Sequence, residues 1–314
     1  MSRILVTGGA GFIGSHVCDA LVAAGHDVTV VDDLSSGCED FLNPAAAFFE
    51  MDIRAAQLAE VFEERRPEYV YHLAAQIDVR RSVEDPLYDA DVNVRGSINL
   101  LELCVAHNVK KFIFASTGGA IYGSPEKLPA PETCPALPES HYGVSKYCVE
   151  QYIGLYGRLH KLPYTILRFP NVYGPRQNPH GEAGVCSILA GLMLDGTAPV
   201  LYGQGEPLRD YVYVGDIARG CLLALKKGDR EILNLGSGKG TSVKDLFSHI
   251  QKLTKFEGKA VLKDLRAGEV QKIYITGARA AEVLGWKPEV PLKEGLERTV
   301  AFIREQREKA AEEA

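Results

Sequence analysis

The sequence predicts an α/β fold in which a doubly wound parallel sheet is joined to a smaller α+β domain. Three observations support this prediction. A glycine-rich turn at residues 8–14 follows a short apolar run at the start of the chain. Apolar runs then alternate with helical patterns up to about residue 170, and small or polar residues follow several of these runs. Strands that alternate with helices form parallel sheets, and such sheets bind ligands beyond the carboxyl ends of their strands.

The first β-α-β unit is the clearest local signal. Residues 3–7 form a short apolar run that is typical of a buried parallel strand. Residues 12–24 follow with an apolar face at helical spacing, and Gly25 is placed to end that helix. The other expected strands are residues 27–31, 47–50, 69–73, 111–115 and 164–168. The other expected helices are residues 55–65, 88–107, 141–160 and 292–309.

The alternation weakens in the second half of the chain, where loops rich in glycine and proline appear. We therefore expect residues 1–170 to form a dinucleotide-binding Rossmann domain, to which later segments can return. We expect residues 171–314 to form mainly a substrate-binding domain. The glycine-rich run at residues 236–240 lacks the spacing of a P-loop, so we interpret it as a turn before a helix that Ser242 and Asp245 begin.

Composition excludes several classes of protein. The chain has 314 residues, 46% of them hydrophobic, and its net charge of −6 argues against sequence-independent binding to nucleic acid. Its apolar runs fall short of the roughly 18 residues that a membrane span needs. The seven cysteines are scattered and odd in number, and they fit a reduced, cytoplasmic compartment. The eight histidines show no pairing of the kind that binds metal, so we expect no metal site.

The glycine-rich turn predicts a bound dinucleotide. Gly8 allows a tight turn, Gly11 lets the backbone approach a pyrophosphate, and Gly14 lets the helix pack closely on the sheet. Phe12 and Ile13 open that helix, and the amino end of a helix favours the phosphate charge. A purely structural glycine turn is the alternative.

Acidic residues follow the second expected strand. Asp32 lies 18 positions after Gly14, where a carboxylate can accept hydrogen bonds from the ribose hydroxyls of the adenosine. The same charge would repel a 2′-phosphate, so we predict NAD in preference to NADP. The alternative is that Asp32 or its neighbour Asp33 caps a turn or helix.

Two further segments follow strands at the same edge. Asp52 and Ile53 are expected at the adenine edge, although Asp52 is nearly as well suited to cap the helix expected from Ala55. Leu73, Ala74 and Ala75 end the fourth strand with small side chains, as expected where a backbone lies against a cofactor. Close packing alone is the other interpretation of this segment.

Tyr142 and Lys146 are the candidate catalytic pair, because residues four apart share one face of a helix. A phenol has a pKa of about 10. A nearby ammonium and an oxidised nicotinamide would both favour the phenolate, so that Tyr142 can act as a general base. Ser116 and Thr117 end the fifth strand, where their hydroxyls can bind the reacting oxygen or cap the following turn. Together with the glycine turn, Tyr142 and Lys146 indicate hydride transfer on a bound nicotinamide.

With these motifs the chain resembles the extended short-chain dehydrogenases/reductases. Within that group it is most similar to the nucleotide-sugar epimerases that interconvert UDP-glucose and UDP-galactose at C4. The resemblance runs nearly end to end, through residues 7–14, 32, 52–53, 72–75, 93, 116–123, 142–146, 168–174, 209–216 and 234–240. It implies tightly bound NAD, a 4-keto intermediate and a redox-neutral cycle.

The resemblance also assigns roles to residues of the cofactor and catalytic sites. It makes Tyr142 the base and Lys146 the residue that orients the ribose and lowers the pKa of the tyrosine. Thr117 becomes the hydroxyl partner, and Ser116 is the reserve candidate because the inserted glycine can shift the alignment by one residue. Asn93 is placed with the cofactor-binding residues.

The same resemblance places a UDP-sugar in the second half of the chain. Arg209 and Arg266 would meet the diphosphate, because guanidinium suits bidentate contact with phosphate, and Glu269 would bind ribose. Surface ion pairs are the alternative for both arginines. Asn171 is expected to donate to the phosphate or sugar. Val185 and Tyr202 are expected beside the base.

Other members of the group remain as alternatives. Dehydratases typically carry Asp-Glu after the threonine and decarboxylases a nearby Glu, whereas this chain has Gly118 and Gly119. Epimerases of UDP-N-acetylhexosamines, UDP-uronates or dTDP-sugars stay open, as does a reductase that releases its cofactor. Ile273 falls roughly where the family tunes its tolerance for an N-acetyl group. A non-catalytic NAD-sensing regulator is the alternative of another class, and intact Tyr142 and Lys146 argue against it.

The resemblance further implies a homodimer. Val149, Tyr152, Ile153 and Tyr156 form an apolar stripe on the expected helix at residues 141–160, and most of this stripe serves packing within the subunit. Part of it, with the helix around residues 92–104, is expected in a four-helix interface between two subunits.

Overall fold

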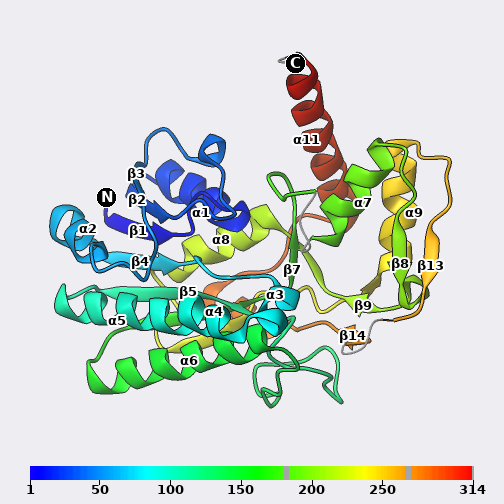
Figure 1. Ribbon diagram of the computed structural model, residues 1–314. Coiled ribbons are helices and arrows are strands. Elements are labelled where there is room, and N and C mark those ends of the chain that lie inside the picture. Colours follow the sequence, from blue (N-terminus) through cyan, green and yellow to red (C-terminus); the bar gives the residue numbers. More distant parts are fainter. Residues whose placement is uncertain (180–183, 266–269, 313–314) are drawn as a thin grey trace.

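The computed structural model describes residues 1–179, 184–265 and 270–312. Its main feature is a seven-stranded sheet in the order β11-β6-β5-β4-β1-β2-β3, in which all neighbours are parallel (Figure 1). This confirms the predicted doubly wound fold. The strands are β1 (Arg3–Thr7), β2 (Asp27–Asp32), β3 (Ala47–Glu50), β4 (Tyr69–His72), β5 (Lys111–Thr117), β6 (Tyr164–Phe169) and β11 (Glu231–Asn234).

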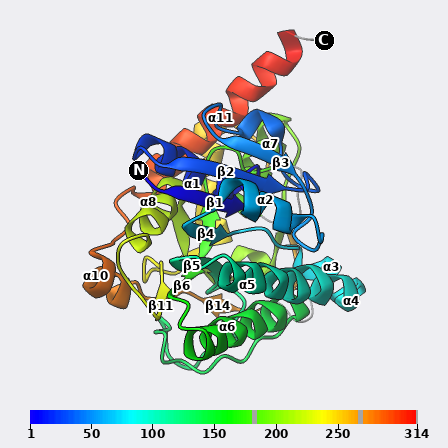
Figure 2. The ribbon, with the colours of Figure 1, turned by 90° about the vertical axis from the view of Figure 1, so that its left-hand side faces the viewer.

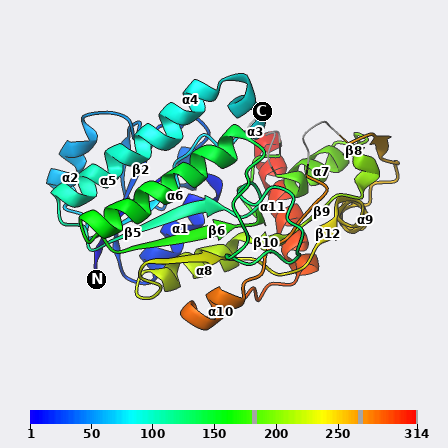
Figure 3. The ribbon, with the colours of Figure 1, turned by 90° about the horizontal axis from the view of Figure 1, so that it is seen from below.

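Helices cover both faces of this sheet, as Figures 2 and 3 show from two further directions. Side chains of a strand alternate between the faces, so Ile4 and Val6 join one core cluster while Leu5 joins another. The first cluster includes residues of α1 (Phe12–Ala23), α8 (Val214–Ala224) and α10 (Ala278–Leu284). The second includes residues of α2 (Leu58–Arg65), α5 (Gly96–Ala106) and α6 (His141–Leu159).

The register at the centre of the sheet positions the candidate site. Thr7 at the end of β1 pairs with Val31 of β2 on one side and with His72 of β4 on the other. The chain order reverses between β1 and β4, which creates the crevice where doubly wound sheets bind ligands. The residues that follow these three therefore meet at one point: the glycine turn, Asp32 and Leu73.

The expected helix at residues 88–107 is wrong in its limits and in its regularity. The chain forms α3 (Val79–Glu84), α4 (Pro86–Ala90), a π-helical turn η2 (Asp91–Arg95) and then α5. Helix α4 begins earlier than expected because Pro86 suits the first turn and the Asp85 side chain accepts the Tyr88 N–H at 3.0 Å. The helix expected at residues 55–65 begins only at Leu58.

The second half of the chain adds a second lobe, defined here by α7 (Val185–Leu194), β8 (Val200–Tyr202), η3 (Gly203–Gly205), β9 (Leu208–Arg209), β12 (Thr241–Ser242), α9 (Val243–Thr254), β13 (Val261–Lys263), β14 (Lys272–Ile273) and α11 (Leu292–Glu312). Its helices share a separate apolar cluster. Between the sheet and this lobe, β7 (Asn171–Tyr173) pairs with β10 (Tyr211–Tyr213). The Ser242 side chain caps α9 by accepting the Asp245 N–H at 3.0 Å, as expected.

A short turn, η1 (Glu39–Phe41), completes the elements between β2 and β3. Within the described ranges, no helix is long and apolar enough to cross a membrane. The same part of the chain contains no cluster of three or more His, Cys, Asp or Glu side chains that could hold a metal ion.

Candidate active site

The glycine turn after β1 is required by the backbone. Gly8 has a φ of +73°, and a Cβ there would come within 2.5 Å of the Ala74 nitrogen. A Cβ on Gly14 would overlap the carbonyl oxygen of Gly8, whereas a Cβ on Gly11 would meet only that oxygen, at 3.2 Å. No side chain caps the amino end of α1 at Gly11. The N–H groups of Phe12 and Ile13 in this first turn therefore suit an anion such as a pyrophosphate.

Asp32 lies at the end of β2 beside this turn and is 7% exposed. Its Oδ2 accepts the Ala10 N–H at 2.9 Å, and its Oδ1 accepts the Leu34 N–H at 3.0 Å. Burial raises the pKa of Asp32, while these two N–H groups act in the opposite direction. Each oxygen keeps capacity for a further donor, as a ribose diol requires. The exposed Asp33 instead accepts the N–H and hydroxyl of Ser35 at 3.0 and 2.6 Å, which is a turn cap.

Asp52 is paired with a neighbouring arginine. Its carboxylate accepts the Arg54 backbone N–H at 2.7 Å and the Arg54 Nε at 2.9 Å, so that the guanidinium holds the pKa of Asp52 below its usual value. Arg54 also bonds Asp91 at 2.6 Å. Ile53 is buried against α5, where a Cβ on Gly96 would come within 2.6 Å of its Cδ1. Asp52 thus stabilises the turn before α2.

The segment after β4 lies directly against the glycine turn. The N–H groups of Leu73 and Ala74 both donate to the Thr7 carbonyl at 3.0 Å, and Ala75 continues the segment partly exposed. His72 is buried, with Nδ1 2.7 Å from the Thr7 hydroxyl. Burial and the charge of Lys146 lower the pKa of His72 to about 3, so its ring is neutral. The ends of β1 and β4 are thereby held together.

The first turn of α6 carries the candidate catalytic pair. The Ser140 hydroxyl accepts the Gly143 N–H at 3.1 Å, and the Ser82 hydroxyl accepts the Tyr142 N–H at 3.2 Å. Lys146 follows one turn later and is 3% exposed. Its Nζ lies 4.2 Å from the centre of the Phe114 ring. To the described residues this ammonium donates no hydrogen bond, so its donors remain for a ligand.

The electrostatics of this pair differ from the expectation. We expected the ammonium to lower the pKa of Tyr142, but burial raises the pKa of that phenol, and the charge of Asp89 raises it further. Burial also lowers the pKa of Lys146 to about 7, against the charges of Glu150 and Asp89. The physical reason is that burial disfavours the charged form of both groups. Tyr142 therefore needs an additional positive charge beside it before it can act as a base.

The two hydroxyls at the end of β5 have different surroundings. Ser116 is 4% exposed, and its Oγ donates to Glu150 Oε1 at 2.6 Å. Thr117 is partly exposed, and its Oγ1 accepts the Ala120 N–H at 3.2 Å. Consecutive residues of a strand point to opposite faces, so only one of the two can face the crevice. Thr117 is the accessible hydroxyl, and it also caps the following turn.

The turn after Thr117 has no room for a side chain at its first position. A Cβ on Gly118 would overlap Cδ1 of the buried Ile275, whereas the nearest atom to a Cβ on Gly119 is Thr117 Oγ1 at 3.8 Å. Ile275 belongs to a segment that pairs with Ala130. This segment follows β14 and links the turn after Thr117 to the second lobe.

The predicted substrate residues lie along the border of the second lobe. The Asn171 N–H donates to the Asp210 carbonyl at 2.9 Å, so β7 begins beside the residue that follows Arg209. Arg209 Nη1 donates to the Leu208 carbonyl at 3.0 Å, and β9 pairs with both β12 and β14. Ile273 in β14 is 2% exposed.

Val185 and Tyr202, the residues expected beside the nucleotide base, are connected through an apolar cluster of the second lobe. Val185 packs against the apolar cluster that contains Leu201, the neighbour of Tyr202. Arg266 and Glu269 lie outside the described residues. Leu265, the residue before Arg266, packs beside Gly203: a Cβ on that glycine would lie 2.9 Å from Leu265 Cδ1.

A buried ion pair below the site was not predicted. Arg168 at the end of β6 donates from Nε to Glu150 at 2.9 Å and from Nη1 to the Tyr122 hydroxyl at 2.7 Å. Tyr122 in turn donates to Asn234 at 2.8 Å. Buried charges require partners. The signal in the sequence was Glu150 itself, a charged residue four positions after Lys146 on the buried face of a helix.

A second network that was not predicted surrounds Asn93. This residue is 2% exposed, and its Oδ1 accepts the Gln76 N–H at 2.8 Å. Its Nδ2 donates to the Gln76 carbonyl at 3.0 Å, to Asp89 at 3.1 Å and to Ser145 at 3.2 Å. Asn93 therefore contacts the loop after β4 and the first turn of α6 at once.

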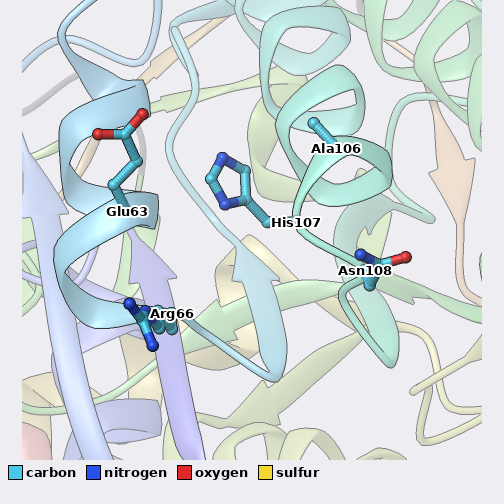
Figure 4. A pocket seen from close by; sticks show the side chains of 5 residues that line it. All are labelled: Glu63, Arg66, Ala106, His107 and Asn108. Atoms are coloured by element: carbon cyan, nitrogen blue, oxygen red, sulfur yellow. The ribbon is translucent and has the colours of Figure 1, made fainter.

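A separate pocket of about 380 Å³ lies where α2 and α5 end (Figure 4). It is lined by Glu63, Arg66, Ala106, His107 and Asn108. The Arg66 carbonyl accepts the Arg3 Nε at 2.8 Å, and Arg3 begins β1. This pocket therefore lies at the amino ends of the strands and contains none of the predicted site residues.

The chain is similar to known proteins along nearly its whole length. Residues 4–236 match the model of the NAD dependent epimerase/dehydratase family. The UDP-glucose 4-epimerase of Mycolicibacterium smegmatis is 41% identical over 308 residues, which cover 96% of this chain and 98% of that protein.

Two solved structures are similar along nearly their whole length. The UDP-glucose 4-epimerase of Thermotoga maritima with UDP-glucose has a TM-score of 0.95 and 50% identity, covering 96% of this chain and 99% of that one. The UDP-glucose 4-epimerase of Thermus thermophilus in complex with NAD has a TM-score of 0.92 and 41% identity, with the same coverage of 96% and 99%. The chain therefore belongs to the NAD dependent epimerase/dehydratase family.

Proposed function

We propose that this chain epimerises C4 of a UDP-hexose, interconverting UDP-glucose and UDP-galactose on tightly bound NAD. The observation that carries the proposal is the arrangement at the end of β5. Thr117 presents an accessible hydroxyl, and the next two residues, Gly118 and Gly119, carry no acid or base. Such a site can oxidise and reduce a sugar hydroxyl, but it lacks the group that elimination of water would need.

The residues of the crevice fit NAD. The positive φ of Gly8, the close approach of Gly14 to Gly8 and the uncapped amino end of α1 form a cradle for the pyrophosphate. The buried carboxylate of Asp32 suits the two hydroxyls of the adenosine ribose and disfavours a 2′-phosphate. Leu73, Ala74 and Ala75 would lie beside the cofactor, and Asp52, Ile53 and Asn93 would border it.

Tyr142 is the proposed base for the sugar 4-hydroxyl. When bound, NAD supplies the hydride acceptor and a positive ring that favours the phenolate. Lys146 would bind ribose with its free ammonium donors, and Thr117 would donate a hydrogen bond to the reacting oxygen. Tyr142 would take the proton of the 4-hydroxyl and later return it, and bound NAD would accept the hydride and give it back, so the cycle would need no external reductant.

The second lobe is the proposed site of the nucleotide. Arg209, with Arg266 beyond the described residues, would hold the diphosphate, and Asn171 lies beside Arg209 at the start of β7. Val185 and Tyr202 would border the base, and Glu269 would bind its ribose. We also propose that residues 171–314 form mainly the substrate domain, with α8 and β11 returning to the large sheet.

We further propose a homodimer. A groove of about 630 Å³ lies between α4, α5 and α6, and it is lined by apolar groups that include Val94, Ile98 and Cys148. On its rim, Leu87 is 82% exposed and Val144 is 53% exposed. A second copy would cover this face in a four-helix interface. Light scattering of the purified protein tests this, and a monomer at working concentrations would overturn it.

The setting follows from the same activity. The seven cysteines are unpaired in the structure, which supports a reducing compartment, and we propose the cytoplasm. Interconversion of UDP-glucose and UDP-galactose would place the protein in galactose metabolism.

The experiment that tests the function is incubation of the purified protein with UDP-galactose, with no NAD added, and chromatography for UDP-glucose. Formation of UDP-glucose shows both 4-epimerisation and a retained cofactor. Turnover of only a UDP-N-acetylhexosamine or a UDP-uronate would change the assigned substrate and leave the proposed 4-epimerisation in place. No turnover of any of these, even with NAD added, would overturn the proposal.

A further inference from the structure

Asp89 is a buried carboxylate next to the proposed catalytic pair that no step of the cycle uses. It lies in α4, is 1% exposed, and accepts N–H groups from Gln76 at 3.0 Å and Asn93 at 3.1 Å. No lysine or arginine of the described ranges forms an ion pair with it. Both amides bond the same oxygen, Oδ1, and Asp89 also lines the groove between α4, α5 and α6.

The hydrogen bonds around Asp89 connect three segments of the site. Asn93 in the π-helical turn bonds both the backbone N–H and the carbonyl of Gln76, which follows the cofactor segment after β4. The same Asn93 donates to the Ser145 hydroxyl at 3.2 Å. Ser145 donates onward to the Tyr142 carbonyl at 3.0 Å. Asp89 thus fixes the side chain that joins the cofactor loop to the first turn of α6.

The charge of Asp89 acts on the same turn. The charges of Asp89 in α4 and Glu150 in α6 both raise the pKa of Lys146, and the charge of Lys146 in turn lowers the pKa of His72 in β4. Glu150 is already paired with Arg168. Asp89 is therefore the carboxylate near Lys146 whose charge no cation in the described part of the chain compensates.

We propose that Asp89 is a positioning residue for the helix that carries Tyr142: its carboxylate fixes Asn93, which in turn holds the Tyr142 turn in place through Ser145. This inference rests on the proposed function for its catalytic consequence. Two substitutions separate the hydrogen-bonded link from the charge. Ser145→Ala breaks the link between Asn93 and the Tyr142 carbonyl and keeps the Asp89 charge. Asp89→Asn removes that charge and keeps the size of the side chain.

The test is the pH profile of kcat with UDP-galactose for these variants. Asp89 raises the pKa of Lys146, whose deprotonation ends activity at high pH, and it also raises the pKa of Tyr142, whose deprotonation begins activity at low pH. We therefore expect Asp89→Asn to move both limbs to lower pH, by about half to one unit. We expect Ser145→Ala to lower kcat about tenfold with both limbs unmoved.

Asp85→Asn is the matched control, because Asp85 is exposed on the same segment and asparagine caps a helix equally well. It removes the same charge and should leave the profile as in the wild type. A lower kcat with unmoved limbs in Asp89→Asn would overturn the electrostatic role. If Asp89→Asn does not fold, Ser145→Ala still decides the positioning role, and a wild-type kcat in that variant would overturn it.

A second measurement does not depend on activity. Lysine side chains labelled with carbon-13 can be titrated by NMR in the purified protein, with Lys146→Met to assign the signal. We expect the Lys146 midpoint near the pKa of about 7 that burial sets, and a lower midpoint in Asp89→Asn. An unchanged midpoint would contradict the effect of the Asp89 charge on Lys146. If the wild type shows no epimerase activity but the Lys146 midpoint still falls in Asp89→Asn, the proposed function is refuted and the effect of Asp89 on Lys146 stands.

Discussion

The contact between Gly118 and Ile275 yields the sharpest prediction, because it joins the turn after Thr117 to the second lobe. A Cβ added at Gly118 would overlap Ile275 Cδ1, and Ile275 is 1% exposed. The next nearest atoms, Ile275 Cγ2 and the Phe169 carbonyl oxygen, lie at 3.4 Å from that Cβ. One terminal methyl group therefore accounts for nearly all of the expected strain.

The magnitude follows from the packing around this methyl group. Forcing an extra methyl group into a packed core destabilises by about 1–3 kcal/mol, so we expect that loss for Gly118→Ala. Ile275→Val removes Cδ1 and by itself should cost about 0.5–1.5 kcal/mol. In the double variant the added methyl group occupies the vacated space. We therefore expect a favourable coupling free energy of about 1–2 kcal/mol between the two substitutions.

Urea unfolding of the four proteins measures this coupling. Gly119→Ala is the matched control, because the nearest atom to its Cβ lies at 3.8 Å and its stability should stay within about 0.5 kcal/mol of the wild type. Gly118→Ala should also lower kcat, because Thr117 adjoins the strained turn. Equal stabilities of Gly118→Ala and Gly119→Ala, or a coupling near zero, would refute the reasoning.

Three further predictions concern single groups. Tyr142→Phe should lower kcat by about 100- to 10,000-fold with the NAD content and Tm of the purified protein unchanged; loss of NAD would instead indicate a binding role. Asp32→Ala leaves the N–H groups of Ala10 and Leu34 without their acceptor, so the free energy of unfolding should fall by about 1–3 kcal/mol. It also removes the proposed ribose contact, so the NAD content should fall severalfold. A full NAD content would contradict that contact. Burial raises the pKa of Asp210 to about 6, above the value of about 3.9 in an unfolded chain, so the folded state binds the proton more tightly. The stability that this carboxyl contributes should therefore be complete below about pH 3 and be lost as the pH rises through about 6, a total fall of about 3 kcal/mol that is finished near pH 7. Urea unfolding at several pH values should show this fall in the wild type and not in Asp210→Asn.

The placement of the glycine turn, Asp32 and Leu73 at one edge of the sheet was predictable because backbone sterics dictate it. Only glycine fits where a Cβ would meet the Ala74 backbone or the Gly8 carbonyl, and such positions are visible in a sequence as glycines at fixed spacing. The register of β1, β2 and β4 then brings Asp32 and Leu73 to the same point without any further requirement. The fold class followed from the same periodicity.

The choice between Ser116 and Thr117 was not predictable from the sequence. The two residues are adjacent and both carry hydroxyls, so the local pattern is the same for either. Their difference arises from Glu150, which lies 34 residues later and accepts the Ser116 hydroxyl. Only the packing of α6 against β5 and β6 shows that the Ser116 hydroxyl is the one buried against Glu150.

The break in the expected helix at residues 88–107 has a similar cause. Its apolar spacing is continuous, but Asn93 bonds across to Gln76 within a π-helical turn. Such a turn is a tertiary feature, because the helix widens to place one side chain against a distant loop. The pKa values of Tyr142 and Lys146 also depend on burial, which spacing alone does not report.

The most direct test of the central claim follows the hydride itself. UDP-galactose with deuterium at C4 is incubated with the protein and no added cofactor, and the UDP-glucose formed is analysed by mass spectrometry and NMR. The account predicts that the deuterium is kept at C4 with inverted configuration and without exchange with water, because it leaves C4 and returns to it on one retained cofactor. Loss of the deuterium, or a requirement for added NADH, would contradict a redox-neutral epimerase.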